Sequence, residues 1–195
     1  MTRIAVVYHS GYGHTQVQAE AVVRGARSVE GTEVALIAVD AVEANWDALD
    51  AADAIVFGSP TYMGGVSAPF KAFIDSTSTR FFSRAWRDKL AAAFTNSASM
   101  SGDKLSTLQA LSVFAMQHGM VWVGLGLPPG NNATTASAHD LNRLGSFLGA
   151  MAQSDGDAGP DVAPPESDRL TAEALGKRVA EAALRWATVP EAVAA

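Results

Sequence analysis

Short apolar runs alternate with segments of helical periodicity along this 195-residue chain, and this alternation most constrains its fold. The runs with the length of buried strands are Arg3–Tyr8, Glu33–Val39, Ala54–Gly58, Leu90–Phe94 and Met120–Val123. The segments with helical spacing are 14–29, Pro69–Ser76, Leu105–Gln117 and Leu170–Trp186. Strands that alternate with helices predict an α/β fold, a doubly wound, five-stranded parallel sheet in the order 2-1-3-4-5.

The loops that follow the strands are where function is expected. In a doubly wound sheet, ligands bind beyond the carboxyl ends of the strands, where the strand order reverses. Here the loops are 9–15, 59–68, 95–103 and 124–140. We expect the binding site to be built from these segments.

Two segments have the composition of irregular structure. Residues 124–139 are rich in Gly, Pro, Asn, Thr and Ser, and residues 153–168 combine acidic residues with three prolines. We interpret the second segment as a solvated connector, because too little chain follows it to form another core. The sequence therefore predicts a single domain over residues 1–195.

Composition and charge exclude several classes of protein. A hydrophobic fraction of 48% excludes global disorder, and the absence of cysteine excludes disulfides and thiolate metal sites. A net charge of −6 without a long basic cluster argues against a nucleic-acid partner. The histidines have no ligand spacing with acidic residues, so we expect no metal site. We expect no signal peptide, no membrane span of about 20 apolar residues, and a cytoplasmic protein.

The first of these loops, Ser10-Gly11-Tyr12-Gly13-His14-Thr15, lies between an expected strand and an expected helix. Its glycines allow close approach of the backbone, and a helix N-terminus offers unpaired N–H groups and partial positive charge. The Gly-Lys-Ser/Thr end of a Walker loop and the third glycine of a dinucleotide fingerprint are both missing. The loop predicts phosphate binding by neutral donors, with a plain capped turn as the alternative.

Three stretches together resemble one known family. Tyr8–Thr15, Phe57–Gly64 and Gln117–Val121 are similar to the flavodoxin-like NAD(P)H:quinone oxidoreductases of the WrbA type. The first stretch is shared by flavodoxins in general, whereas the combination of all three is more selective. The resemblance covers about residues 3–187, and it implies a flavodoxin-like fold with FMN as the cofactor and NADH or NADPH as co-substrate.

The resemblance assigns cofactor-binding residues by position. Those matching the loop around the FMN phosphate are Ser10, Gly11, Tyr12, Gly13, His14 and Thr15, and those beside the isoalloxazine ring are Pro60, Thr61, Tyr62 and Met63. Those at the pyrimidine edge of the ring are Asn96, Ser97, Ala98, Ser99, Met100 and Ser101. Backbone N–H groups of residues 97–101 would stabilise the anionic reduced flavin there. An ordinary polar loop remains the alternative.

Catalytic and substrate-binding residues come from the same resemblance. His118 matches a histidine that approaches the flavin from a neighbouring subunit, where it would bind the flavin and assist protonation of a quinone oxygen. Tyr12 matches an aromatic residue where the nicotinamide nucleotide docks, and Phe81 falls where the family often has a tryptophan shaping the substrate pocket. Without the resemblance, His118 suits a helix end, where the helix dipole favours it.

The chain departs from the family pattern in three places. The third loop is usually glycine-rich in the family, whereas residues 96–102 here read Asn-Ser-Ala-Ser-Met-Ser-Gly. The resemblance therefore does not fix the backbone path of this loop. Tyr62 stands where some members carry arginine, which alters the expected cofactor or substrate preference. The segment between the second and third strands is short and lacks an insertion found in some members.

These assignments predict an FMN-dependent enzyme that transfers hydride from NAD(P)H to quinones in a ping-pong reaction. Two alternatives remain open, a one-electron carrier of the flavodoxin kind and a flavin-binding regulatory protein. A net charge of −6 is modest for a carrier that docks to basic partners.

An aromatic and arginine-rich stretch, residues 80–87, suggests a contact between subunits. It holds Phe81, Phe82 and Trp86 among three arginines, residue types that are enriched at interfaces. We therefore expect a homo-oligomer, a dimer or a tetramer, with a loop anchored by buried aromatic side chains as the alternative.

Overall fold

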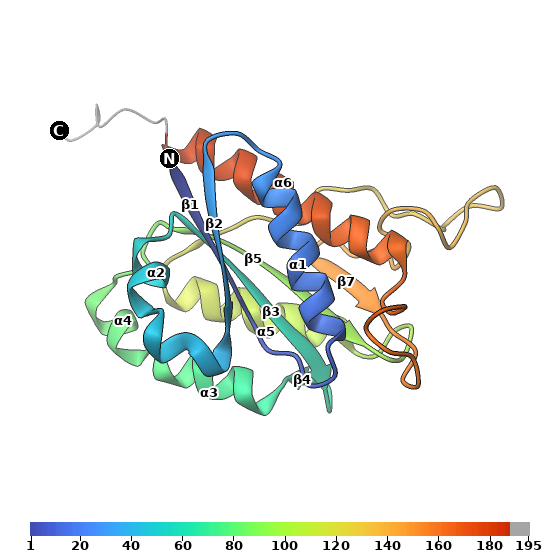
Figure 1. Ribbon diagram of the computed structural model, residues 1–195, viewed down its shortest axis with the longest axis horizontal. Helices are drawn as coiled ribbons and strands as arrows, with labels where there is room; N and C mark the ends of the chain where they lie inside the picture. The colour runs from blue at the N-terminus through green and yellow to red at the C-terminus, as the bar shows by residue number, and fades with distance from the viewer. Residues whose placement is uncertain (188–195) are drawn as a thin grey trace.

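The computed structural model describes residues 1–187 as a parallel sheet covered by helices on both faces (Figure 1). Its strands are β1 (Thr2–Tyr8), β2 (Thr32–Ala38), β3 (Ala54–Tyr62), β4 (Gly65–Val66), β5 (Leu90–Ser97), β6 (Val121–Trp122) and β7 (Ala150–Gln153). Its helices are α1 (His14–Arg27), the 3-10 helix η1 (Val39–Ala44), α2 (Trp46–Ala51), α3 (Ala68–Ser76), α4 (Ser78–Ser83), α5 (Lys104–Gln117) and α6 (Glu166–Ala187). The part of the single-domain prediction that covers 188–195 lies outside the described residues.

The order of the main strands is β2-β1-β3-β5-β6, with all of these neighbours parallel. Counted as five strands along the chain, this is the predicted order 2-1-3-4-5, and the doubly wound fold is confirmed. Successive residues of the central strands face opposite helical layers, as the period of a strand requires. In β3, Val56 packs under α1 and α6, whereas Ile55 and Phe57 pack under the helices of the other face.

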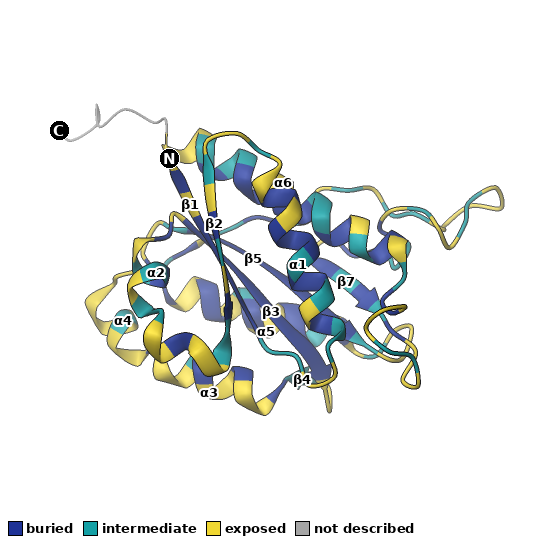
Figure 2. Cartoon of the chain, in the orientation of Figure 1, coloured by how far each residue is buried: buried dark blue, intermediate teal, exposed yellow. Residues whose placement is uncertain are grey.

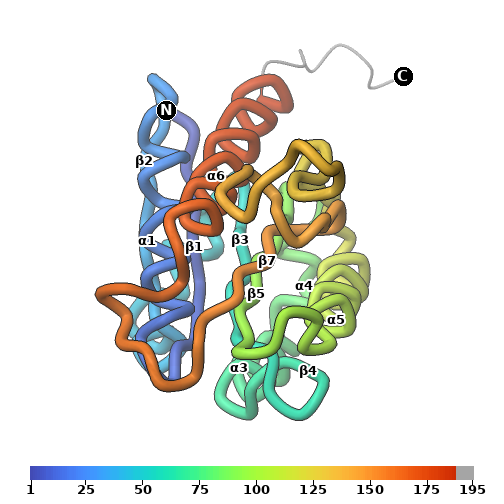
Figure 3. The backbone as a smooth tube through the Cα atoms, turned by 90° about the vertical axis from the view of Figure 1, so that its right-hand side faces the viewer, coloured from blue at the N-terminus to red at the C-terminus, as the bar shows by residue number. Residues whose placement is uncertain are grey.

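The two helical layers are seen edge-on in Figure 3, with α1 and α6 on one side of the sheet and α3 and α5 on the other. Buried residues of both layers and of the sheet form two apolar clusters, one on each face (Figure 2). The central strands are buried on both faces, which explains why their sequences are continuously apolar.

The fifth strand is divided. β6 pairs with the beginning of β5 through Leu90↔Val121, and β7 pairs with the end of β5 through Phe94↔Ala150 to Ser97↔Gln153. Residues 123–149 leave the sheet between them and form the loop that projects from the body in Figure 1. The sequence prediction missed β7, because four residues after a glycine- and proline-rich segment carry little signal of their own.

Other predicted boundaries also need correction. β3 and β5 continue to Tyr62 and Ser97, past the predicted ends at Gly58 and Phe94, because the two strands stay paired as far as Pro60↔Asn96. The segments η1, α2 and α4 were not predicted, since each is only six residues long. Helix α6 begins at Glu166 rather than Leu170, so it takes up the last residues of the predicted connector.

Helices α1 and α6 cross at two glycines. A Cβ on Gly25 of α1 would overlap the carbonyl oxygen of Glu173, and a Cβ on Gly176 of α6 would overlap the carbonyl oxygen of Val22. The two backbones are therefore in direct contact, and only glycine permits this separation. The crossing fixes where α6 begins over the carboxyl edge of the sheet.

We predict that Gly176→Ala destabilises the protein, although alanine is the better helix former. Helix propensity alone would favour alanine by about 1 kcal/mol. The overlap with the Val22 carbonyl is with backbone rather than a mobile side chain, so we expect a net loss of about 1–3 kcal/mol. Urea unfolding measures the change, and an increase in stability would contradict this packing.

Candidate functional site

A pocket of about 300 Å³ opens at the carboxyl edge of the sheet, between the ends of β1, β3 and β5. It is lined by Ser10, Tyr12, His14, Thr15, Pro60, Tyr62, Asn96, Ser97, Ala98, Ser154 and Gly156. Nine of these eleven residues belong to the predicted cofactor-binding set, so the structure brings the three predicted loops together. The other two, Ser154 and Gly156, were not predicted.

The first loop ends at the N-terminus of α1. Gly13 is the N-cap residue, with φ of 88°, a left-handed conformation that suits glycine. No side chain caps the helix, so its first N–H groups remain available to a ligand. Thr15 is buried in the first turn and lines the pocket, and the first loop is tied to the segment before α3 by a 2.9 Å hydrogen bond between His9 Nδ1 and Ser67 Oγ.

The second loop is a tight hairpin between β3 and β4. Met63 and Gly64 form its two central residues, with φ of 48° and 78°, the pattern of a type I′ turn. Met63 is fully exposed at the tip, and Tyr62 lines the pocket. Burial raises the pKa of the Tyr62 phenol, with a smaller contribution from Tyr12, so this hydroxyl stays protonated at neutral pH.

The side chain of Thr61 points into the protein rather than into the pocket. Its hydroxyl hydrogen-bonds the hydroxyls of Thr95 and Thr107, both at 2.8 Å, inside the protein. Thr61 is buried and does not line the pocket. Its side chain therefore fastens the end of β3 to β5 and α5, and its contribution to a cofactor site is through the backbone.

The third loop has its carbonyl groups turned into the protein. The carbonyl of Ser97 accepts a hydrogen bond from Ser154 N (3.1 Å), and that of Ala98 accepts one from Gln153 Nε2 (2.9 Å). The carbonyl of Ser99 accepts from Lys104 Nζ at 2.7 Å. Within residues 1–187, the backbone N–H groups of residues 98–101 donate no hydrogen bond. Of these four residues, Ala98 lines the pocket, whereas residues 99–101 continue the loop beyond it, so the four donors are free for a ligand that extends past the pocket wall.

The segment after β7 forms a further wall of the pocket, although most of residues 155–162 are exposed, as the predicted solvated connector requires. Asn96 Nδ2 donates to Ser154 Oγ (2.9 Å), and His14 Nε2 lies 2.8 Å from the carbonyl oxygen of Ala158. Pro160 lies so close to Gly13 that a Cβ there would come within 2.9 Å of its ring. Composition missed this wall, because acidic residues and prolines predict solvent exposure and carry no signal for these contacts.

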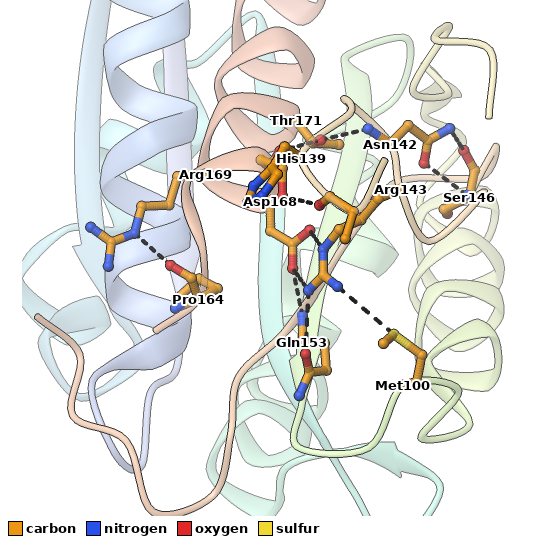
Figure 4. Close-up of polar contacts among 12 residues, drawn as sticks. Met100, His139, Asn142, Arg143, Ser146, Gln153, Pro164, Asp168, Arg169 and Thr171 are labelled. Atoms are coloured by element: carbon orange, nitrogen blue, oxygen red, sulfur yellow. Dashed lines mark hydrogen bonds and ion pairs between the residues drawn. The ribbon is translucent and has the colours of Figure 1, made fainter. Parts of the chain in front are cut away.

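A buried ion pair between Arg143 and Asp168 fixes Gln153, where this wall begins (Figure 4). Arg143 binds Asp168 through two hydrogen bonds of 2.7 and 2.8 Å, with side chains 7% and 1% exposed. Asp168 also accepts from the backbone N–H of Gln153 (2.9 Å), whose side chain holds the carbonyl of Ala98. Asp168 lies in the first turn of α6, where the helix dipole favours a carboxylate.

His118 does not lie at the pocket. It caps the C-terminus of α5, at the opposite edge of the sheet, and is 6% exposed between Trp86 and Phe114, with ring centroids 4.7 and 4.9 Å away. Thr77 Oγ1 donates to the Ile74 carbonyl, so His118 Nε2 donates to Thr77 (3.0 Å) and Nδ1 carries no proton. Burial lowers the pKa of His118, which keeps it neutral.

The remaining predicted residues are exposed. Tyr12 is 78% exposed at the pocket rim, and Met100 is exposed in the third loop. Phe81 lies beside Phe82 and His118 on the far side of the fold, away from the pocket. The role of His118 at the flavin of a neighbouring subunit and that of Phe81 in the substrate pocket stay predictions.

The donor set of the pocket fits FMN. Two buried side-chain oxygens facing it, Ser10 Oγ and Asn96 Oδ1, have no hydrogen-bond partner within residues 1–187. Buried polar atoms are rarely left unpaired, and a ligand with donors and acceptors at both ends of the pocket would satisfy them. A helix N-terminus suits a phosphate, and the free N–H groups suit a carbonyl-bearing ring edge.

No cluster of three or more metal-ligating side chains occurs among residues 1–187. None of the helices in that range has the length and apolarity needed to cross a membrane.

This sheet order, with a polar pocket at the carboxyl edge, defines a flavodoxin-like protein. The family described as NADPH-dependent FMN reductase matches residues 16–135, and the chain belongs to this family. FMN is therefore the cofactor, NADPH is the electron donor in the family's description, and the predicted resemblance to WrbA-type oxidoreductases is confirmed.

Individual relatives are similar in sequence to this chain over nearly its whole length. A protein named flavodoxin FldP, from Pseudomonas aeruginosa strain UCBPP-PA14, is 45% identical over 92% of this chain and 96% of its own length. An NAD(P)H dehydrogenase (quinone) from Archaeoglobus fulgidus is 35% identical over 94% of this chain and 98% of its own. A solved WrbA-like flavodoxin from Agrobacterium tumefaciens is 44% identical, covers 95% of this chain and 99% of its own, and has a TM-score of 0.74.

We predict that Asp168→Ala destabilises the protein by about 3–5 kcal/mol, because it leaves the Arg143 guanidinium buried without its carboxylate. The double variant Arg143→Met/Asp168→Ala removes both charges and should recover part of this loss. Denaturant unfolding of the two variants measures both effects. A loss below about 1 kcal/mol for Asp168→Ala would show that the pair does not hold the wall.

Proposed function

We propose that the protein is an FMN-dependent oxidoreductase that passes a hydride equivalent from NAD(P)H to a quinone. The observation that carries this proposal is the pocket with a helix N-terminus at one end and free backbone N–H groups at the other. The quinone relative from Archaeoglobus fulgidus supports the class of acceptor. FMN, when bound, supplies the hydride chemistry, and the protein supplies position and electrostatics.

The first loop would hold the phosphate of FMN. Ser10 Oγ, Thr15 and the N–H groups of residues 11–15 are neutral donors, and the dipole of α1 favours the phosphate charge. Lysine and arginine are absent from residues 10–15, so the phosphate would be held by neutral hydrogen bonds and the helix dipole.

The second and third loops would hold the ring. Pro60 and Tyr62 would border it on one side, while Asn96, Ala98 and the free N–H groups of residues 99–101 just beyond the pocket would border its pyrimidine edge. Such donors stabilise negative charge that develops when the ring accepts hydride. Because their carbonyl groups are already fixed inside the protein, these N–H groups need little rearrangement to do so.

One side of the pocket is open to co-substrates. Tyr12, 78% exposed, and the half-exposed Tyr62 stand at its rim as aromatic surfaces on which flat rings can stack. NAD(P)H and a quinone would use this rim in turn, in a ping-pong order. The identity of the quinone stays outside this proposal.

A homo-oligomer is part of the proposal. Helix α5 exposes Leu105, Val113 and Met116, and α4 exposes Phe82. Apolar side chains therefore lie on the solvent-facing side of these two helices. Exposed apolar groups of this kind are typical of surfaces that a partner covers. A dimer or tetramer, with His118 near the flavin of a neighbouring subunit, stays a prediction, as do the substrate-pocket role of Phe81 and the cytoplasmic location.

A one-electron carrier is the second candidate, favoured by the flavodoxin name of the relative that is 45% identical. The two functions differ in what NAD(P)H does. A carrier does not oxidise nicotinamide nucleotides by itself and accumulates a flavin radical during chemical reduction.

The deciding experiment is anaerobic addition of NADPH or NADH to the FMN-loaded protein. We expect the yellow flavin absorbance to bleach without a long-lived radical, and benzoquinone to restore it. A stable radical on dithionite titration, with no oxidation of NADPH or NADH, would establish the carrier instead. Light scattering on the same sample gives the oligomeric state, and a fully active monomer would refute the homo-oligomer.

We predict that Thr15→Ala weakens FMN binding but leaves riboflavin binding nearly unchanged. Thr15 is buried in the first turn of α1, and loss of one hydrogen bond to a charged phosphate costs about 1–3 kcal/mol. Flavin fluorescence quenching gives both dissociation constants. Equal weakening of FMN and riboflavin binding would show that this loop does not bind the phosphate.

A further inference from the structure

Lys104 lies buried beneath the third loop. It is the first residue of α5 and is 1% exposed. Its ammonium group donates 2.7 Å hydrogen bonds to Ser97 Oγ and to the carbonyl oxygen of Ser99. Ser97 lines the pocket, so the charge is separated from the pocket wall by a single hydrogen bond.

This position is an unfavourable one for a lysine. Burial of an ammonium group carries a desolvation cost, and a positive charge at a helix N-terminus opposes the helix dipole. Within residues 1–187, no carboxylate lies within the 4.0 Å of an ion pair with Lys104. The nearby carboxylate of Asp168 is bound by Arg143 on two atoms. The protein therefore keeps an uncompensated positive charge under the third loop.

We propose that Lys104 is a positioning residue that also sets the reduction potential of the flavin. It holds the carbonyl of Ser99 inward, which leaves the N–H group of Met100 in the same peptide plane directed away from it and free, and it places positive charge behind the loop that begins at Ser97 and Ala98 in the pocket wall. This inference rests on the proposed function, in which the free N–H groups of this loop border the pyrimidine edge of FMN. No sequence motif of the first or second loop supplies such a charge, since both lack lysine and arginine.

In the proposed reaction, the flavin gains a negative charge with which the ammonium group of Lys104 interacts. NAD(P)H transfers hydride from C4 of its nicotinamide to N5 of FMN and leaves as NAD(P)⁺. The flavin gains one hydrogen and two electrons, and its new negative charge lies at N1 and the C2 carbonyl. A fixed cation near that edge stabilises the reduced ring more than the oxidised ring, which is the condition for accelerating hydride acceptance.

The protonation of Lys104 responds to the same charge. Desolvation lowers its pKa from 10.5 to about 8, with Asp168 raising the pKa and Arg143 lowering it. The carboxylates of Asp103 and Asp155 on the adjoining loops are exposed. Lys104 is thus charged at pH 7 in the oxidised protein and loses its proton above about pH 8. A negative flavin raises this pKa, so reduction above pH 8 takes up one more proton.

The test compares midpoint potentials of FMN-loaded variants by dye-coupled reductive titration at pH 7. Lys104→Met should lower the reduction equilibrium constant about tenfold or more, which is about 30 mV for a two-electron couple. Lys104→Arg, which keeps the charge, should recover most of it. Lys177→Met removes an equal charge from the exposed surface of α6 and should leave the potential unchanged.

A second measurement needs no variant. In the wild-type protein, the midpoint potential should fall more steeply with pH between the pKa of Lys104 in the oxidised protein, about 8, and its higher pKa in the reduced protein, by up to about 30 mV more per unit, because up to one more proton is taken up per two electrons. A constant slope through pH 9.5, or an unchanged potential in Lys104→Met that still binds FMN, would overturn the role of Lys104. Failure of the wild-type protein to bind FMN would instead overturn the proposed function.

Discussion

Hydrogen bonds to the carbonyl groups of residues 97–99 are the interaction on which the candidate site depends. Residues 98–102 follow the end of β5 and have no ladder to fix them, yet the carbonyls of residues 97–99 are held by Ser154, Gln153 and Lys104. Because each carbonyl points inward, the adjacent N–H groups are left for a ligand. In relatives whose third loop is glycine-rich, glycine would allow such a path, whereas here side chains from other segments enforce it.

The same constraint connects the site to the rest of the fold. Gln153 ends β7, and its backbone N–H binds Asp168 in the first turn of α6 (Figure 4). The position of α6 is set by its glycine contact with α1, and α1 begins at the first loop. The first and third loops are thus positioned by one continuous structure, although about 80 residues of chain separate them.

The sequence could predict those parts that depend on local pattern. Strand and helix order follow from periodicity, and the first and second loops carry their own motif. The third loop could not be predicted, because its path depends on Lys104, Gln153 and Ser154, which bear no sequence signal for it. The connector after β7 is mostly exposed, as its composition predicts, but its contacts with the pocket carry no sequence signal for the same reason. His118 is buried inside its own chain, so a role at a neighbouring flavin depends on an assembly that one chain does not contain.

The most direct test of the central claim is an amide proton and nitrogen correlation spectrum of the ¹⁵N-labelled protein during flavin titration. If the inward carbonyls leave the N–H groups of residues 98–101 for the ring, these amide signals should shift with both riboflavin and FMN. The signals of residues 11–15 should shift strongly only with FMN, which carries the phosphate. Amide signals of 98–101 that stay unmoved at saturating FMN would contradict the account.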